Sequence, residues 1–159
     1  MTSLEIVVSG RPAPQGSKRT VGRGRMVEMS RYLGPWRAAV QAAAARAMAA
    51  TPGAYPLPGA IVARMVFTVE RPRGHYGTGR NANRVRPSAP NVPAAVPDLS
   101  KLVRSTEDAL TIAGVWADDA RVVDYTRLAK VYPGRDPEAL DEPGVRITIH
   151  QYPLTSVIT

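Results

Sequence analysis

The chain has 159 residues, which suits one domain, and a hydrophobic fraction of 44%, which is enough for a buried core. Cysteine is absent and histidine occurs twice, which excludes a disulfide scaffold, a thiolate nucleophile and metal sites built from Cys or several His residues. No apolar run reaches the roughly 18 residues of a membrane helix, and there is no signal-peptide pattern. We therefore expect a soluble, cytoplasmic protein that binds no membrane.

Charge is divided unevenly along the chain. The formal net charge is +8, which favours a polyanionic partner such as nucleic acid. Residues 1–97 hold 14 basic and 3 acidic side chains, whereas residues 98–159 hold 7 basic and 10 acidic ones. Phosphate binding needs cations and a hard metal ion needs carboxylates, so the two parts are expected to serve these two purposes. The alternative is that the charges only keep the surface soluble.

The first third of the chain predicts a strand, a basic loop and a helix. Leu4, Ile6 and Val8 alternate with more polar positions, which is typical of a half-buried strand. Residues 11–25 are rich in Gly, Pro and basic side chains and predict an exposed loop. Pro35 is suited to the first turn of a helix that continues through an Ala-rich run and ends before residue 51.

The middle of the chain predicts a central strand followed by a long basic arm. Residues 61–69 alternate between two partly apolar faces, which favours a strand inside a sheet. Residues 71–97 contain five Arg, five Pro, three Gly and no acid, which predicts a flexible segment without regular elements. Such an arm can order on nucleic acid, with His75 and Tyr76 available to stack or hydrogen-bond. The alternative is a disordered insertion without a function.

The last part predicts a helix and two strands. Apolar residues recur at helical spacing from Leu99 to Ala113, with Asp98 placed as the N-cap and Gly114 as the stop. Residues 115–119 are expected to be extended, and residues 121–132 and 145–150 to be strands joined by an acidic loop. The order β-α-β-α-β-β predicts an α+β fold with a mixed sheet of about four strands and two helices.

Three carboxylates are candidates for a metal site. The helix that follows Asp98 is roughly 21 Å long, and the seven residues up to Asp119 can span about 23 Å if extended. A returning strand is therefore expected to bring Asp119, or alternatively Asp118, back beside Asp98. Two carboxylates in contact repel each other unless a divalent cation lies between them. The alternatives are that Asp98 is only a helix cap and that the other two form only a turn.

Several segments closely resemble the RusA family of Holliday junction resolvases, which are common in phages and prophages. The most specific are residues 97–104 (PDLSKLVR), 108–111 (DALT) and 113–120 (AGVWADDA). Supporting matches are residues 12–19 (PAPQGSKR), the ERP at the end of the central strand (residues 70–72) and KVYPG (residues 130–134). Together these segments cover nearly the whole chain in order.

The resemblance implies a homodimeric, Mg²⁺-dependent endonuclease, with Mn²⁺ as an alternative ion, that nicks opposing strands of four-way DNA junctions in recombination and repair. The family motif Asp-Leu-Asp-Asn-Leu-x-Lys places its first Asp at Asp98, and the later essential Asp falls at Asp119, beside Asp118. Here Ser100 replaces the second Asp, Lys101 the Asn and Arg104 the Lys. A neutral Ser100 oxygen is expected to weaken metal binding, and Arg104 can stabilise negative charge but cannot transfer a proton.

The candidate site residues fall into three sets. The catalytic candidates are Asp98, Asp119, Arg104 and Lys101. The metal ligands are Asp98, Asp119, Asp118 and Ser100. The DNA-binding candidates are Lys18, Arg19, Arg23, Arg25, Arg71, Arg73, Arg80, Arg84 and Arg86.

No organic cofactor is expected, and the compartment implied is the cytoplasm of a bacterial cell or a phage-infected host. One rival hypothesis is a junction-binding or DNA-binding protein in which Ser100 marks weakened or lost nuclease activity. Another is a basic protein associated with RNA or ribosomes, for which charge is the main argument.

Overall fold

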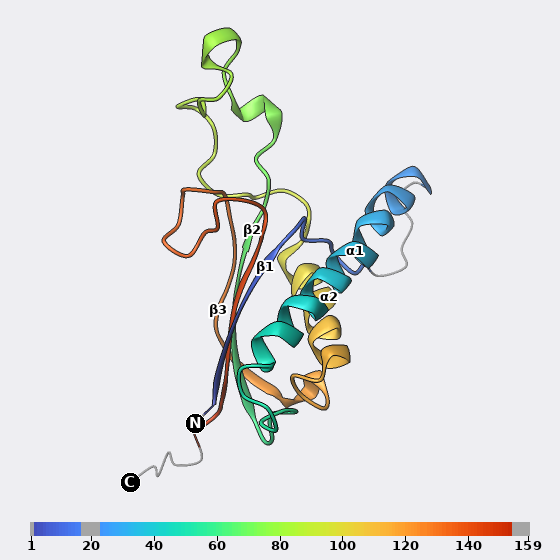
Figure 1. Cartoon of the computed structure of the whole chain (residues 1–159). Helices are drawn as coiled ribbons and strands as arrows, with labels where there is room; N and C mark the ends of the chain where they lie inside the picture. The colour runs from blue at the N-terminus through green and yellow to red at the C-terminus, as the bar shows by residue number, and fades with distance from the viewer. Residues whose placement is uncertain (1, 17–22, 154–159) are drawn as a thin grey trace.

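The computed structural model describes residues 2–16 and 23–153, with only the backbone for residues 23–30. It consists of a four-stranded mixed sheet and two long helices, so the predicted α+β class and the order β-α-β-α-β-β are confirmed (Figure 1). The strands are β1 (Ser3–Ser9), β2 (Ile61–Thr68), β3 (Val122–Val131) and β4 (Gly144–Gln151). The helices are α1 (Arg23–Met48) and α2 (Leu99–Ala113), with 3-10 turns η1 (Arg73–His75), η2 (Gly79–Asn81) and η3 (Asp119–Arg121).

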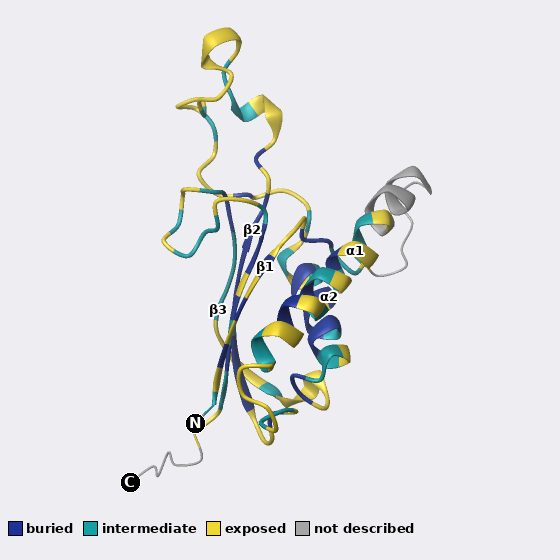
Figure 2. Ribbon diagram, in the orientation of Figure 1, coloured by how far each residue is buried: buried dark blue, intermediate teal, exposed yellow. Residues whose placement is uncertain are grey.

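The sheet has the order β1-β4-β2-β3, in which β2 and β3 run parallel and the other pairs antiparallel. Both helices cover one face of the sheet, and buried residues fill the layer between them (Figures 1 and 2). Trp36 of α1 is 1% exposed, and its indole Nε1 donates to Thr106 Oγ1 of α2 at 3.2 Å. This bond satisfies a buried donor and fixes the two helices against each other.

The opposite face of the sheet carries charged side chains. Arg64 lies between two core residues of β2, Ala63 and Met65, and therefore points to the face without helices. The loop after β3 lies there, and Glu138 forms ion pairs with Arg64 and Arg127, each at 2.5 Å. The predicted acidic loop is thus neutralised in part by arginines of the sheet.

Helix α1 begins earlier than expected. The sequence places its start at Pro35, but the helix runs from Arg23 and contains this proline. A proline inside a helix removes one backbone hydrogen bond and costs about 3 kcal/mol. Tyr32 and Leu33, in the turn before it, pack against the core, and this burial supports the helix through the proline.

Because α1 begins at Arg23, the last residues of the predicted basic loop are helical. Arg23 and Arg25 lie in the first turn of α1, whereas Lys18 and Arg19 lie outside the described residues. The expectation of one continuous loop over residues 11–25 is therefore wrong at its end.

The arm over residues 71–97 projects beyond the end of the sheet and is partly regular (Figure 1). It contains η1 and η2, and an antiparallel bridge pairs Tyr76 with Val85. The backbone N–H of Gly77 donates to the carbonyl of Arg84 at 2.9 Å, and Arg86 Nε donates to the carbonyl of Tyr76 at 2.7 Å. The expectation of a segment without regular elements is wrong for residues 73–86, because these backbone and side-chain hydrogen bonds close a compact loop.

In the part of the chain that the structure describes, neither helix is long and apolar enough to cross a membrane.

Candidate functional site

Helix α2 positions most of the predicted catalytic residues, and its bounds agree with the prediction. Gly114 ends it in the left-handed conformation, with φ of 87°, and its N–H bonds to the carbonyls of Leu110 and Thr111. Asp98 occupies the N-cap position, but its side chain makes no capping bond and instead pairs with Lys101 Nζ at 3.1 Å. The Asp98 carboxylate therefore remains exposed and is balanced by a neighbouring cation.

The N-terminal end of α2 gathers segments that are distant in sequence. Lys130 of β3 donates to the carbonyls of Ala95 and Pro97 at 2.7 and 2.9 Å, which fixes the chain that leads into Asp98. The N–H of Gln15 donates to the carbonyl of Lys101 at 3.2 Å. The loop after β1 and the end of the arm therefore both meet this end of the helix.

Two further predicted residues of this helix, Ser100 and Arg104, are exposed on its first turns. They are one turn apart and project from the same face, so both are accessible to a large ligand such as DNA.

Asp118 and Asp119 lie at the other end of α2. The chain turns directly after Gly114 and is held there by two contacts. The carbonyl of Val115 accepts a hydrogen bond from the N–H of Leu57 at 2.8 Å. Trp116 is buried, and its indole Nε1 donates to Thr111 Oγ1 at 2.7 Å. The returning strand β3 begins only at Val122, after both aspartates. The expectation that Asp119 returns beside Asp98 within one chain is therefore wrong.

The length of α2 sets the separation of the two ends. Asp119 lies near Asp108 and Thr111, ten and thirteen residues after Asp98, and at about 1.5 Å per residue this places the two aspartates about 15–20 Å apart along the helix. No metal ion is shared by carboxylates at that distance, because oxygen ligands lie within about 2.6 Å of the ion.

The aspartates at the C-terminal end belong to a larger acidic group. A cavity of about 290 Å³ is lined there by Asp108, Asp118 and Asp119 together with Arg37, Thr111 and Ile112. Burial and the neighbouring carboxylates of Asp118 and Asp108 raise the pKa of Asp119. The N–H of Ala120, which donates to Asp118 Oδ1 at 2.8 Å, lowers the pKa of Asp118. The two adjacent aspartates therefore differ in their tendency to hold a proton.

Glu107 is a buried member of this group that the sequence analysis did not select. It is 7% exposed, and burial raises its pKa. Its carboxylate accepts a hydrogen bond from the hydroxyl of Tyr125 on β3, and burial together with this bond raises the pKa of Tyr125. The sequence does contain a signal that the acidic residues lie together. Gly114 ends the helix and only a short segment follows it, so Asp118 is expected near the last turns of the helix, where Glu107 lies.

Among the described side chains, those of residues 2–16 and 31–153, no three His, Asp or Glu residues come together as a metal-binding group. One chain therefore presents Asp98 at one end of α2 and the acidic group of residues 107, 108, 118 and 119 at the other. Taken alone, this donor set does not fit a complete site for a divalent cation.

The predicted DNA-binding residues of the arm differ in exposure. The exposed ones are Arg73, Arg80, Arg84 and Arg86. Of these, Arg86 also donates a hydrogen bond to the carbonyl of Tyr76. Arg71 is buried at 5% exposure, so the structure assigns it contacts within the protein, described below.

The family model for the endodeoxyribonuclease RusA matches residues 9–150. No curated protein matches the chain. A match over most of the sequence defines the class, an endodeoxyribonuclease, and the chain belongs to the RusA family.

The raised pKa of Glu107 predicts a pH effect on stability. Folding raises this pKa above its ordinary value of 4.5, so the folded state loses stability as the pH rises through the raised value. Glu107→Gln keeps an acceptor for Tyr125 but cannot ionise. It should therefore be more stable than the wild type at pH 8, and the difference should shrink at pH 4, as measured by urea denaturation. Glu142→Gln, at an exposed position, is the control; no gain at pH 8 for Glu107→Gln would contradict the assignment.

Proposed function

We propose that the protein binds four-way DNA junctions and nicks opposing strands by metal-dependent phosphodiester hydrolysis, in DNA recombination and repair. The observation that carries this proposal is the match to the RusA family together with exposed Asp98 and Asp119 at the two ends of α2. The proposed compartment is the cytoplasm of a bacterial cell or of a phage-infected host.

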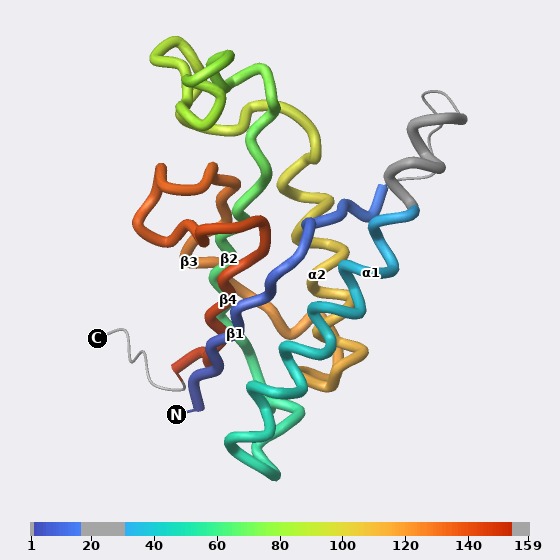
Figure 3. Tube along the Cα trace, turned by 45° about the horizontal axis from the view of Figure 1, so that its top comes forward, coloured from blue at the N-terminus to red at the C-terminus, as the bar shows by residue number. Residues whose placement is uncertain are grey.

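The proposed DNA surface includes the exposed arginines of the arm and the basic start of α1. Arg73, Arg80 and Arg84 extend on a loop that stands away from the sheet (Figure 3). Cations on such a loop contact phosphates and recognise the shape of a branched duplex more than its base sequence. Lys18, Arg19, Arg23 and Arg25 remain predicted members of this surface.

The proposed metal site needs two copies of the chain. Asp98 and Asp119 are too far apart in one copy, but a two-fold dimer can bring Asp98 of one copy to the partner subunit's Asp119, and the same contact then occurs twice. A four-way junction also has two-fold symmetry, so two such sites would face two opposing strands. Dimerisation therefore explains why one chain carries the acidic residues as two separate groups.

The residues around Asp98 have defined parts in this proposal. Asp98, Asp119, Asp118 and the neutral oxygen of Ser100 are the proposed ligands of Mg²⁺ or Mn²⁺, which when bound would polarise the phosphate and activate water. Lys101 balances the Asp98 carboxylate at 3.1 Å. The exposed guanidinium of Arg104, one turn after Ser100, is placed to stabilise extra negative charge on a phosphate.

The second candidate function is junction binding without cleavage. It is favoured by Ser100, which supplies no charge where the family motif has a second Asp. Nicking of an immobile four-way junction in Mg²⁺, with a linear duplex of the same sequence as control, distinguishes the two. Nicking of the junction alone supports the nuclease, and tight binding without any nicking supports the alternative.

The two aspartates give the first functional prediction. Asp98→Asn and Asp119→Asn should each lower junction nicking by at least about a hundredfold, because a bound metal contributes several kcal/mol to the transition state. Junction affinity should be unchanged or higher, because removing an anion near phosphates relieves repulsion. Asp141→Asn, an exposed residue of the acidic loop, is the matched control. Full nicking by either variant would contradict the site.

The arm gives a second prediction. Arg80→Ala and Arg84→Ala together should weaken junction binding and make the plot of log affinity against log salt shallower by about 0.9 for each phosphate that the arm no longer neutralises. Arg46→Ala, exposed in the last turn of α1, should leave the slope unchanged. An unchanged slope in the double variant would show that the arm does not contact DNA.

A further inference from the structure

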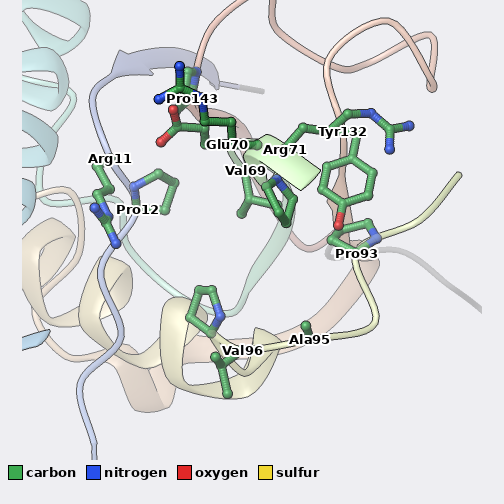
Figure 4. A pocket seen from close by; sticks show the side chains of 13 residues that line it. Arg11, Pro12, Val69, Glu70, Arg71, Pro93, Ala95, Val96, Tyr132 and Pro143 are labelled. Carbon is green, nitrogen blue, oxygen red and sulfur yellow. The ribbon is translucent and has the colours of Figure 1, made fainter. Parts of the chain in front are cut away.

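A cavity of about 350 Å³ lies at the base of the arm, at the N-terminal end of α2 and away from the acidic group (Figure 4). Its walls come from the loop after β1, the end of β2, the end of β3 and the segment that leads into Asp98. Residues that matter for its chemistry are Arg11, Glu70, Arg71, Arg73, Val96 and Tyr132. At about 30 Å³ for each water molecule, this space is large enough for a nucleobase.

The walls of the cavity are held in place by contacts between distant segments. Tyr132 is 4% exposed, with the Arg71 guanidinium 4.2 Å from its ring centre and the His75 ring edge-on at 5.7 Å. Arg71 Nη1 also donates to the carbonyl of Pro90 at 2.8 Å and to His75 Nδ1 at 3.0 Å. On the opposite side, the guanidinium of Arg11 lies 3.9 Å from the ring centre of Tyr32. The cavity is thus preformed, which lowers the entropic cost of binding a ligand.

One polar group of this wall lacks a partner. Arg71 Nη2 is buried and makes no hydrogen bond, and the only other such side-chain atom among the described residues is Gln15 Oε1. Gln15 lies against the same end of α2, because its backbone N–H donates a hydrogen bond to the carbonyl of Lys101. A buried donor without an acceptor costs roughly 1–3 kcal/mol, so the region favours a ligand that supplies hydrogen-bonding groups.

The composition of the lining selects among ligands. Tyr132, Val69 and several prolines supply apolar surface, while Arg11, Arg71 and Arg73 supply positive charge. A free inorganic anion would leave the apolar walls uncovered. A nucleotide suits both parts, because its base is flat and apolar on its faces, its edges bear amino and carbonyl groups, and its phosphates are anionic.

We propose that this cavity receives one unstacked nucleotide of the bound DNA, with its base against Tyr132 and the prolines and its phosphates at Arg11 and Arg73. The proposal rests on the proposed function and adds a subsite to it. Pro97 lines the cavity and Asp98 follows directly, so the unstacked nucleotide lies next to the Asp98 half of the metal site. Unstacking costs least where base pairs are interrupted, so the subsite favours nucleotides at the branch point.

The test uses Val96→Trp, which adds an indole at a position that lines the cavity and is 79% exposed. Val92→Trp is the matched control, at an arm position that is 62% exposed and outside the lining. Junctions carrying 2-aminopurine at successive positions around the branch point are bound by the full chain without divalent metal. One position should show a fluorescence rise with the wild type and with Val92→Trp, and this rise should be absent with Val96→Trp.

An abasic nucleotide at that position completes the test. Val96→Trp should bind the normal junction about tenfold more weakly than the wild type, but should bind the abasic junction as well as the wild type does, because no base has to enter the cavity. A misfolded variant would lose affinity for both junctions equally. The proposal is overturned if Val96→Trp keeps the wild-type fluorescence rise and affinity while the wild type nicks junctions in Mg²⁺. Absence of nicking by the wild type would instead contradict the proposed nuclease function.

Discussion

The length of α2 is the constraint on which the arrangement of the acidic residues depends. The helix starts beside Asp98, and Asp119 lies near Asp108 and Thr111 in its last turns, so the two family aspartates are about 15–20 Å apart along the helix. It cannot bend to shorten this distance, because Leu102 and Leu110 are fully buried and Trp36 of α1 is bonded to Thr106 midway along it. Under the proposed function, this spacing would make one chain insufficient for a metal site and would require a second copy.

The same helix separates two environments of different chemistry. Its N-terminal end meets Lys101, Lys130 and the cavity with its three arginines, whereas its C-terminal end is dominated by carboxylates, among which Glu107 and Asp119 have raised pKa values. In a two-fold dimer the acidic end of one copy would meet the basic end of the other, so opposite charges would favour the pairing that completes the site. In the proposed complex, phosphates would approach from the basic side, where the arm projects.

Local patterns predicted much of the fold, and long-range contacts decided the rest. The alternation of Leu4, Ile6 and Val8 and the Gly114 stop are properties of neighbouring residues, and both elements occur as predicted. The early start of α1 depends on packing of Tyr32 and Leu33 against the core. The conformation of the arm depends on the contact between Arg71 and Tyr132. Local composition could predict neither feature, because both depend on residues distant in sequence. The placement of Asp119 followed from the burial of Trp116, which turns the chain before the strand begins. The motif thus identified the candidate residues, but it did not predict the distance between Asp98 and Asp119.

Mixing two inactive variants tests the shared site most directly. Asp98→Asn and Asp119→Asn are combined in equal amounts and allowed to exchange subunits, with differently tagged copies to confirm the exchange. If each site takes Asp98 from one copy and Asp119 from the other, a mixed dimer regains one intact site, and random exchange should restore about a quarter of wild-type nicking. A mixture that exchanges subunits, binds junctions and remains as inactive as either variant alone would contradict a site built from two chains.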